Sequence, residues 1–168
     1  MQIRPEQASD VEAIHRLNGA AFETDAEAKL VDRLRTGAQP FLSLVATENN
    51  SIVGHILFTP VSAEKESGAR ILGLAPMAVN PQRQNQGIGS ALVLAGLDAA
   101  RELGYQAVVV LGHPAFYPRF GFKPADSFHI HSEYEVPADV FMALELEPGS
   151  LAKTTGLVKY HPAFAELE

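Results

Sequence analysis

Residues 71–104 constrain the fold more than any other stretch of this chain. The segment begins with the apolar run Ile71–Val79, which predicts a β-strand. A polar turn follows, then two glycines, Gly87 and Gly89, and then a nearly all-apolar segment that predicts a buried helix reaching Leu103. Gly104 stands where a helix C-cap is expected. The segment therefore predicts a strand, a glycine-containing turn and a helix that packs against a sheet.

The turn before this helix is a candidate anion site. The first N–H groups of a helix lack internal partners and carry the positive end of the helix dipole, and glycine lets the backbone approach a phosphate closely. Two common phosphate loops are excluded by the residues present. Ser90-Ala91 follows Gly89 where a P-loop needs Lys-Ser/Thr, and Leu92 stands where a dinucleotide fingerprint needs its third glycine.

Three segments, in the same order and spacing, resemble the GNAT superfamily of N-acetyltransferases. Gln84–Gly89 resembles its pyrophosphate loop, Gln/Arg-x-x-Gly-x-Gly/Ala. Met77–Pro81 resembles the family's strand end, and Tyr117–Phe122 resembles its Tyr-x-x-x-Gly-Phe segment. The resemblance covers about Ile3–Phe122 and is greatest to a bacterial subgroup of largely uncharacterised enzymes.

The resemblance implies an α/β (α+β) GNAT fold. Its central sheet is mixed and mostly antiparallel, has about six to seven strands flanked by helices, and is splayed at the central strands. The length of 168 residues predicts one N-acetyltransferase domain, 1–168, with a core of about 1–148 and a tail at 149–168. Outside the organising segment, we expect helices opening at Ser9–Asp10 and Thr24–Asp25, a loop at Ser62–Arg70, and strands at Gln2–Arg4, Phe41–Thr47, Ser51–Val61, Gln106–Leu111, Phe128–Ile130, Val140–Leu146 and Gly156–Tyr160.

The activity implied by the resemblance is an acyltransferase reaction. An acetyl group passes from acetyl-CoA, the cosubstrate, to a primary amine of a small molecule or protein by direct attack in a ternary complex. The residues that match the family's acetyl-CoA contacts are Met77, Ala78, Val79, Gln84, Asn85, Gln86, Gly87, Ile88, Gly89, Ser90 and His113. A module that binds acyl-CoA without turnover, as a sensor or interaction domain, is the alternative.

Tyr117 is the candidate catalytic residue, because it lies four residues before Gly121, as the family's proton-donating tyrosine does. Its alternative role is a buried aromatic residue. The chain departs from the family just upstream, where Gly112 and His113 occupy the place of an asparagine that contacts the pantetheine arm. Pro118 also disfavours helical backbone at Tyr117.

The general base is left open, because the strand Ile71–Val79 has no acidic residue. The amine proton leaves through water or through one of several candidates: His113, His55, Glu23, Glu133 or Glu135. For His55 a structural role is favoured over a catalytic one. Phe22, Glu23 and Glu27 lie where the family's first two helices form a wall of the acceptor pocket, although core packing of Phe22 and solvation of both glutamates are the commoner roles.

Composition restricts the partners. The chain has no cysteine, which excludes disulfides and a thiolate nucleophile, and of the scattered histidines only His129 and His131 are spaced to share a strand face; we expect no metal. A net charge of −7 argues against nucleic acid and mildly favours a cationic amine. No apolar stretch predicts a membrane span, so we expect a cytoplasmic protein that is a monomer or a homodimer.

Overall fold

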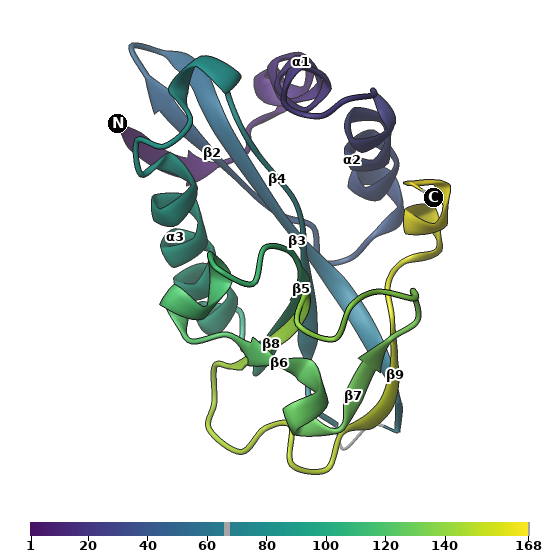
Figure 1. Ribbon diagram of the computed structural model, residues 1–168. Coiled ribbons are helices and arrows are strands. Elements are labelled where there is room, and N and C mark those ends of the chain that lie inside the picture. The colour runs from purple at the N-terminus through teal and green to yellow at the C-terminus, as the bar shows by residue number, and fades with distance from the viewer. Residues whose placement is uncertain (66–67, 168) are drawn as a thin grey trace. The chain divides into compact units, whose positions relative to one another are not determined.

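A computed structural model describes residues 1–65 and 68–167 (Figure 1). The strands are β1 (Gln2–Pro5), β2 (Leu42–Glu48), β3 (Ser51–Lys65), β4 (Ile71–Val79), β5 (Ala107–Leu111), β6 (Lys123–Pro124), β7 (Ile130–Ser132), β8 (Phe141–Glu145) and β9 (Thr155–Lys159). The α-helices are α1 (Val11–Ala21), α2 (Ala26–Gly37) and α3 (Ile88–Glu102). Short 3₁₀ turns are η1 (Ala8–Asp10), η2 (Pro81–Arg83), η3 (Tyr117–Phe120), η4 (Ala125–Phe128) and η5 (Pro162–Leu167). The fold is mixed α/β with a mostly antiparallel open sheet flanked by helices.

The chain forms two compact units, and β3, β4 and α3 run from one into the other. Unit 1 contains Met1–Thr59, Ala75–Gly96 and the C-terminal residues from Pro162. Unit 2 contains Pro60–Leu74 and Leu97–His161.

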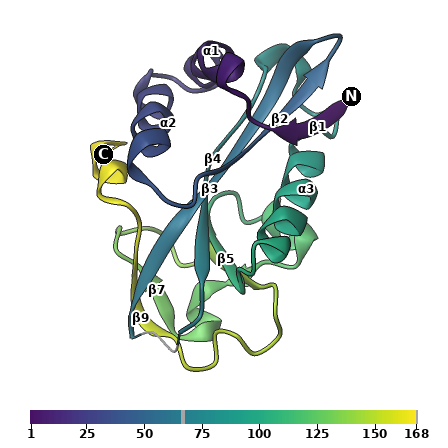
Figure 2. The same cartoon turned by 180° about the vertical axis from the view of Figure 1, so that it is seen from behind.

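Unit 1 is built on an antiparallel hairpin. β2 and β3 pair from Leu42↔Phe58 to Glu48↔Ser51, and β1 adds to the outer side of β2. Asn49 and Asn50 both have positive φ, 50° and 64°, as a two-residue hairpin turn requires. α1 and α2 lie side by side in this unit, and η5 packs on α2 (Figures 1 and 2).

Unit 2 is organised around β5, whose residues Ala107–Val110 are 0–1% exposed. β5 pairs parallel with the first part of β4, from Ile71↔Ala107 to Leu74↔Val110, and antiparallel with β8 on its other side. A strand that has partners on both sides and is buried on both faces favours the β-branched run found here. β9 pairs with the end of β3 and, in parallel, with β7.

Most predicted elements are confirmed, and two are wrong. Ser62–Arg70 was expected to be a loop, but β3 continues to Lys65 because its end pairs with β9, for example Ser62↔Lys159. Residues 66 and 67 of that expected loop lie outside the described residues. Phe128–Ile130 is not a strand: η4 occupies the chain through Phe128, His129 has a left-handed φ of 62°, and β7 begins only at Ile130.

Candidate functional site

The position of α3 depends on a glycine in β3. A Cβ atom at Gly54 would lie 2.8 Å from Cγ2 of Ile88 and 2.9 Å from Cδ1 of Leu92. Both distances are too short for a carbon–carbon contact. Because Gly54 has no side chain, the first turn of α3 packs directly on the strand, and Ile88 is 3% exposed. The helix N-terminus is thereby fixed on the sheet of unit 1.

The end of β4 is fixed by the backbone and side chain of Asn80. Its N–H donates to the carbonyl of Val53 in β3 at 2.9 Å. Its side-chain Oδ1 accepts the N–H of Gln82 at 2.9 Å, which caps η2, and its carbonyl accepts the N–H of Arg83 at 2.8 Å. The root of the loop between β4 and α3 therefore has a defined conformation.

The tip of this loop is exposed and held from one side. Arg83 forms an ion pair with Glu48 of β2, and its Nε donates to Oε1 of Gln86 at 2.9 Å. The residues from Gln84 to Gly87 are exposed. Positive φ angles fall at Asn85 (64°) and Gly87 (85°). Gly89, by contrast, is the second residue of α3, so of the two glycines only Gly87 has a left-handed backbone.

The loop and helix start fit a phosphate-bearing ligand. The N–H of Ala91 donates to the carbonyl of Gly87 at 3.1 Å, and this hydrogen bond closes the first turn of α3. The N–H groups of Ile88 and Gly89 precede this bond and have no helical acceptor. No acidic residue lies between Gln84 and Ser90, and nothing stands within 4 Å of the Cβ position of Gly87. An anion can therefore approach the positive end of the α3 dipole closely.

Met77, Ala78 and Val79 form the end of β4 in unit 1. Met77 and Val79 are half-buried, whereas Ala78 is 2% exposed, so the two flanking residues share one side of the strand. The described pairing of β4 with β5 ends at Leu74, two residues before Pro76. Proline has no N–H to offer a ladder at that point.

Tyr117, in unit 2, begins η3 and is 7% exposed. Its ring makes edge contacts with Phe116 at 5.0 Å and with Phe122 at 5.6 Å between centroids, and it lies against Gly112. Burial raises the pKa of the Tyr117 hydroxyl to about 12. The phenol therefore keeps its proton at neutral pH and can serve as a donor. Gly112 is the residue of this cluster whose role the sequence did not reveal.

His113 lies just before Tyr117 with an exposed side chain. Its carbonyl accepts the N–H of Phe116 at 3.1 Å and the N–H of Tyr117 at 3.4 Å. The backbone of His113 thus shapes the start of η3, and its imidazole stays open to solvent. The structure brings His113 and Tyr117 together in unit 2, and it brings Met77–Val79 and Gln84–Ser90 together in unit 1.

His55 is fully buried in unit 1 and belongs to a polar chain of side chains. Its Nε2 lies 2.9 Å from Oγ of Ser43, and that hydroxyl donates to Oε1 of Glu6 at 2.7 Å. The Asn18 amide lies 3.2 Å from Nδ1 of His55. These partners fit a neutral imidazole that carries its proton on Nε2. Burial lowers the pKa of His55 to about 4, which indicates the structural role.

The other base candidates are dispersed. Glu23 and Glu135 are exposed, and Glu27 and Phe22 are half-buried. Glu133 accepts the backbone N–H of Tyr160 at 2.6 Å, which gives this carboxylate a structural partner.

His129 lies outside β7, so it does not share a strand face with His131. Among residues 1–65 and 68–167, no group of three or more His, Cys, Asp or Glu could hold a metal ion, and no helix is long and apolar enough to cross a membrane.

The loop and the start of α3 fit a phosphate-bearing ligand, and comparison with known proteins identifies the family. Residues 39–124 match the acetyltransferase (GNAT) domain family. The chain is 40% identical over 165 residues to the uncharacterised N-acetyltransferase YhbS of Escherichia coli K12, covering 98% of each chain. The chain therefore belongs to the GNAT family of N-acetyltransferases.

Solved structures of similar proteins contain CoA or acetyl-CoA. The crystal structure of Escherichia coli YhbS in complex with CoA is 39% identical, with a TM-score of 0.90 over 98% of this chain and 91% of that one. A GNAT acetyltransferase from Brucella melitensis in complex with acetyl-CoA is 35% identical, with a TM-score of 0.78 over 97% of both chains.

Proposed function

We propose that this protein transfers the acetyl group of acetyl-CoA to a primary amine of a small molecule or protein, by direct attack in a ternary complex. The observation that supports it most is the exposed loop Gln84–Gly87 at the N-terminus of α3, free of acidic residues. Relatives that are 35–39% identical hold CoA or acetyl-CoA in their crystal structures. We also propose that residues 1–168 act as a single N-acetyltransferase domain.

The loop is the proposed site of the pyrophosphate. Backbone N–H groups of Gln84, Asn85, Gln86, Gly87, Ile88, Gly89 and Ser90, together with the polar side chains among these residues, would bind its oxygens. The exposed amide of Asn85 adds a neutral donor, and the Gln84 amide, which donates to the carbonyl of Val79 at 3.4 Å, has a second N–H to offer. Arg83 is engaged with Glu48 and supports the loop instead of binding the ligand.

The strand end is the proposed site of the pantetheine arm. Backbone groups of Met77 and Val79 would hydrogen-bond the arm as an added strand, with Ala78 between them. A backbone N–H near Met77 or Ala78 is the proposed donor to the tetrahedral oxyanion. We include His113 among the cofactor-binding residues because it replaces the family's asparagine.

The reaction needs two proton movements. The amine nitrogen attacks the thioester carbonyl carbon, the carbon–sulfur bond breaks, the amine loses a proton and the departing thiolate gains one. We propose Tyr117 as the donor to the thiolate, because it lies four residues before Gly121, as the family's proton-donating tyrosine does, and its hydroxyl is protonated at neutral pH. We propose that the amine proton leaves to water. No structural feature favours one of the candidate bases over the others.

The test is a thiol-release assay with acetyl-CoA and a panel of amines that contains small cationic amines and Lys-containing peptides. Amine-dependent release of CoA, with acetylated amine detected by mass spectrometry, would support the transferase. Binding of acetyl-CoA without release for any amine of the panel would favour the non-catalytic alternative.

A further inference from the structure

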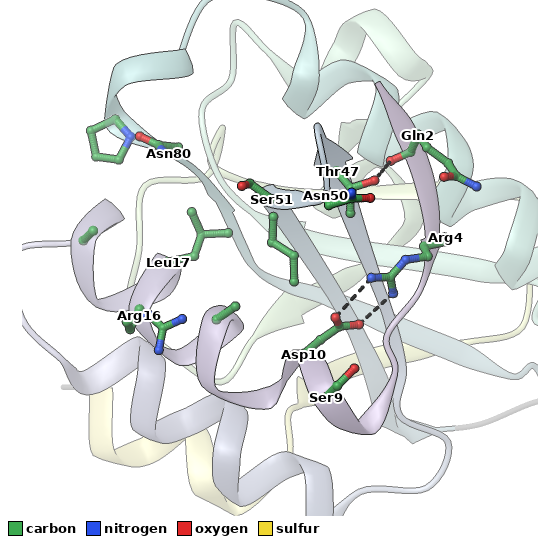
Figure 3. A pocket seen from close by; sticks show the side chains of 14 residues that line it. Gln2, Arg4, Ser9, Asp10, Arg16, Leu17, Thr47, Asn50, Ser51 and Asn80 are labelled. Carbon is green, nitrogen blue, oxygen red and sulfur yellow. Dashed lines mark hydrogen bonds and ion pairs between the residues drawn. The ribbon is translucent and has the colours of Figure 1, made fainter.

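A hollow of about 730 Å³ lies within unit 1, between α1 and the ends of β1, β2, β3 and β4 (Figure 3). Pockets of about 300–1,000 Å³ are typical of small-molecule sites. All of its lining residues lie in Met1–Ile52 or at Asn80 and Pro81, which places it outside the loop proposed for the pyrophosphate.

The hollow exists because one face of α1 carries small side chains. Ala13 and Ala20 are two helical turns apart and face the hollow together with Leu17. Ile52 of β3 lines the opposite wall. Larger side chains at the two alanines would fill the space between the helix and the strands. The floor at Leu17 and Ile52 is apolar, whereas most of the rim is polar.

Several polar side chains on the rim are available to a ligand. Gln2, Ser9, Asn50 and Ser51 line the hollow, and their side chains make no hydrogen bond to another described residue. They come from three separate parts of the chain, namely β1, η1 and the β2–β3 turn with the start of β3 (Figure 3). Amide and hydroxyl groups of this kind can donate and accept hydrogen bonds.

The available charge on the lining is positive. The carboxylate of Asp10 is already satisfied, since it accepts from Arg4 at 2.7 and 3.1 Å and from the N–H of Gln7 at 2.7 Å. Arg16 is different: its nearest carboxylate, Glu12, lies 3.9 Å away, and both side chains are largely exposed, at 72% and 92%. An exposed pair of this kind contributes little, so Arg16 is free to bind an anion.

We propose that this hollow binds a small hydroxylated carboxylate. The carboxylate would pair with the Arg16 guanidinium, its hydroxyl groups would bond the unpartnered rim amides and hydroxyls, and its carbon chain would lie over Leu17 and Ile52. Arginine suits this role because its planar guanidinium can hold a carboxylate through two hydrogen bonds. The site does not depend on acetyl transfer.

The test is calorimetric titration of the full chain with malate and citrate, with sorbitol as the uncharged probe. We expect at least one of the two anions to bind with a Kd of about 1 mM or tighter, and sorbitol to bind at least about tenfold more weakly. Arg16→Gln should weaken the anion by about tenfold or more, and Ala13→Leu should abolish binding by filling the hollow.

The matched control is Arg101→Gln, which removes another exposed arginine, on α3, outside the hollow. It should bind the anion as the unmodified protein does. No binding of either anion, equal binding of sorbitol, or unchanged binding in Arg16→Gln would overturn the proposal. Because Arg16→Gln alters an exposed side chain, its result stands even if Ala13→Leu fails to fold.

Discussion

The ring of Tyr117 occupies the space that a side chain at Gly112 would fill. A Cβ atom at Gly112 would lie 2.3 Å from Cε2 of Tyr117 and 2.9 Å from Cδ2. The backbone of Gly112 cannot easily move aside, because its N–H donates to the carbonyl of Val140 at 2.9 Å. The position of the proposed proton donor therefore depends on the absence of a side chain five residues earlier in the chain.

Gly112→Ala should displace the Tyr117 ring and lower kcat, while acetyl-CoA affinity changes little. The physical reason is the overlap of the added methyl group with the ring, which forces a new rotamer or a backbone shift. Steady-state kinetics and calorimetric binding would separate the two effects. Gly19→Ala is the matched control, since nothing lies within 4 Å of that Cβ position. A wild-type kcat in Gly112→Ala would show that turnover does not need the ring where it lies.

Tyr117→Phe should lower kcat by about 10- to 100-fold and leave the Kd for acetyl-CoA nearly unchanged. The loss is modest for a general acid because a thiolate with a conjugate pKa of about 8.5 is already a fair leaving group. Burial raises the pKa of Tyr117 to about 12, so kcat should show no fall from tyrosine ionisation up to about pH 10. The pH profile of kcat measures this. An unchanged kcat would mean that Tyr117 packs in the core and is not the proton donor.

Gly96→Ala should destabilise the protein by about 1–3 kcal/mol. A Cβ atom at Gly96 of α3 would lie 2.3 Å from Cε1 of Phe58, a residue of β3 that is 0% exposed, so the ring or the helix must shift within a packed core. The ordinary gain from replacing a helical glycine by alanine is about 1 kcal/mol and does not offset this overlap. Urea unfolding measures the change. Equal or greater stability would mean that the strand and helix separate more easily than the packing indicates.

His55 should make the free energy of unfolding fall as the pH drops from about 6.5 to about 4. Burial lowers the folded-state pKa to about 4, whereas the unfolded imidazole titrates near 6.5. Between these values the unfolded state binds the extra proton, so acid favours unfolding, by up to about 3 kcal/mol across the window.

His55→Gln should flatten that part of the stability profile, because glutamine has no proton to gain. Urea unfolding at a series of pH values measures it, with His131→Gln, an exposed residue of β7, as the control. If His55→Gln kept the full pH dependence, another group would have to be its source.

The structure of residues 71–104 was predictable because the sequence signals for it are local. β4 has the predicted bounds Ile71–Val79, and α3 runs from Ile88 to Glu102, one residue short of the predicted end at Leu103, with Gly104 at a left-handed φ of 85° after it. A strand, a capped turn and an apolar helix are each specified by neighbouring residues. β3, by contrast, is longer than predicted. Its final residues pair with β9, which lies about a hundred positions later in the chain, so no local signal marks them as a strand.

The parts of the site that the sequence did not reveal depend on contacts between distant or unremarkable residues. A glycine such as Gly112 can mark a turn, a strand end or a close approach, and only the structure shows the Tyr117 ring against it. The hollow beside α1 depends on Ala13 and Ala20, and alanine in a helix gives no signal of a cavity. By contrast, the burial of His55 agrees with the structural role that was favoured from the sequence.

The most direct measurement is calorimetric titration of the protein with acetyl-CoA, with NADH as the control ligand and two charge variants of α3. We expect acetyl-CoA to bind with a Kd of about 1–100 µM and NADH to give no response. Gly89→Asp should weaken acetyl-CoA by about 100-fold or more, because a carboxylate would meet the pyrophosphate at the helix N-terminus. Leu94→Asp adds the same charge at an exposed position of the same helix and should bind nearly as the unmodified protein does. Absence of acetyl-CoA binding, or wild-type affinity in Gly89→Asp, would contradict the assignment of this loop as the cosubstrate site.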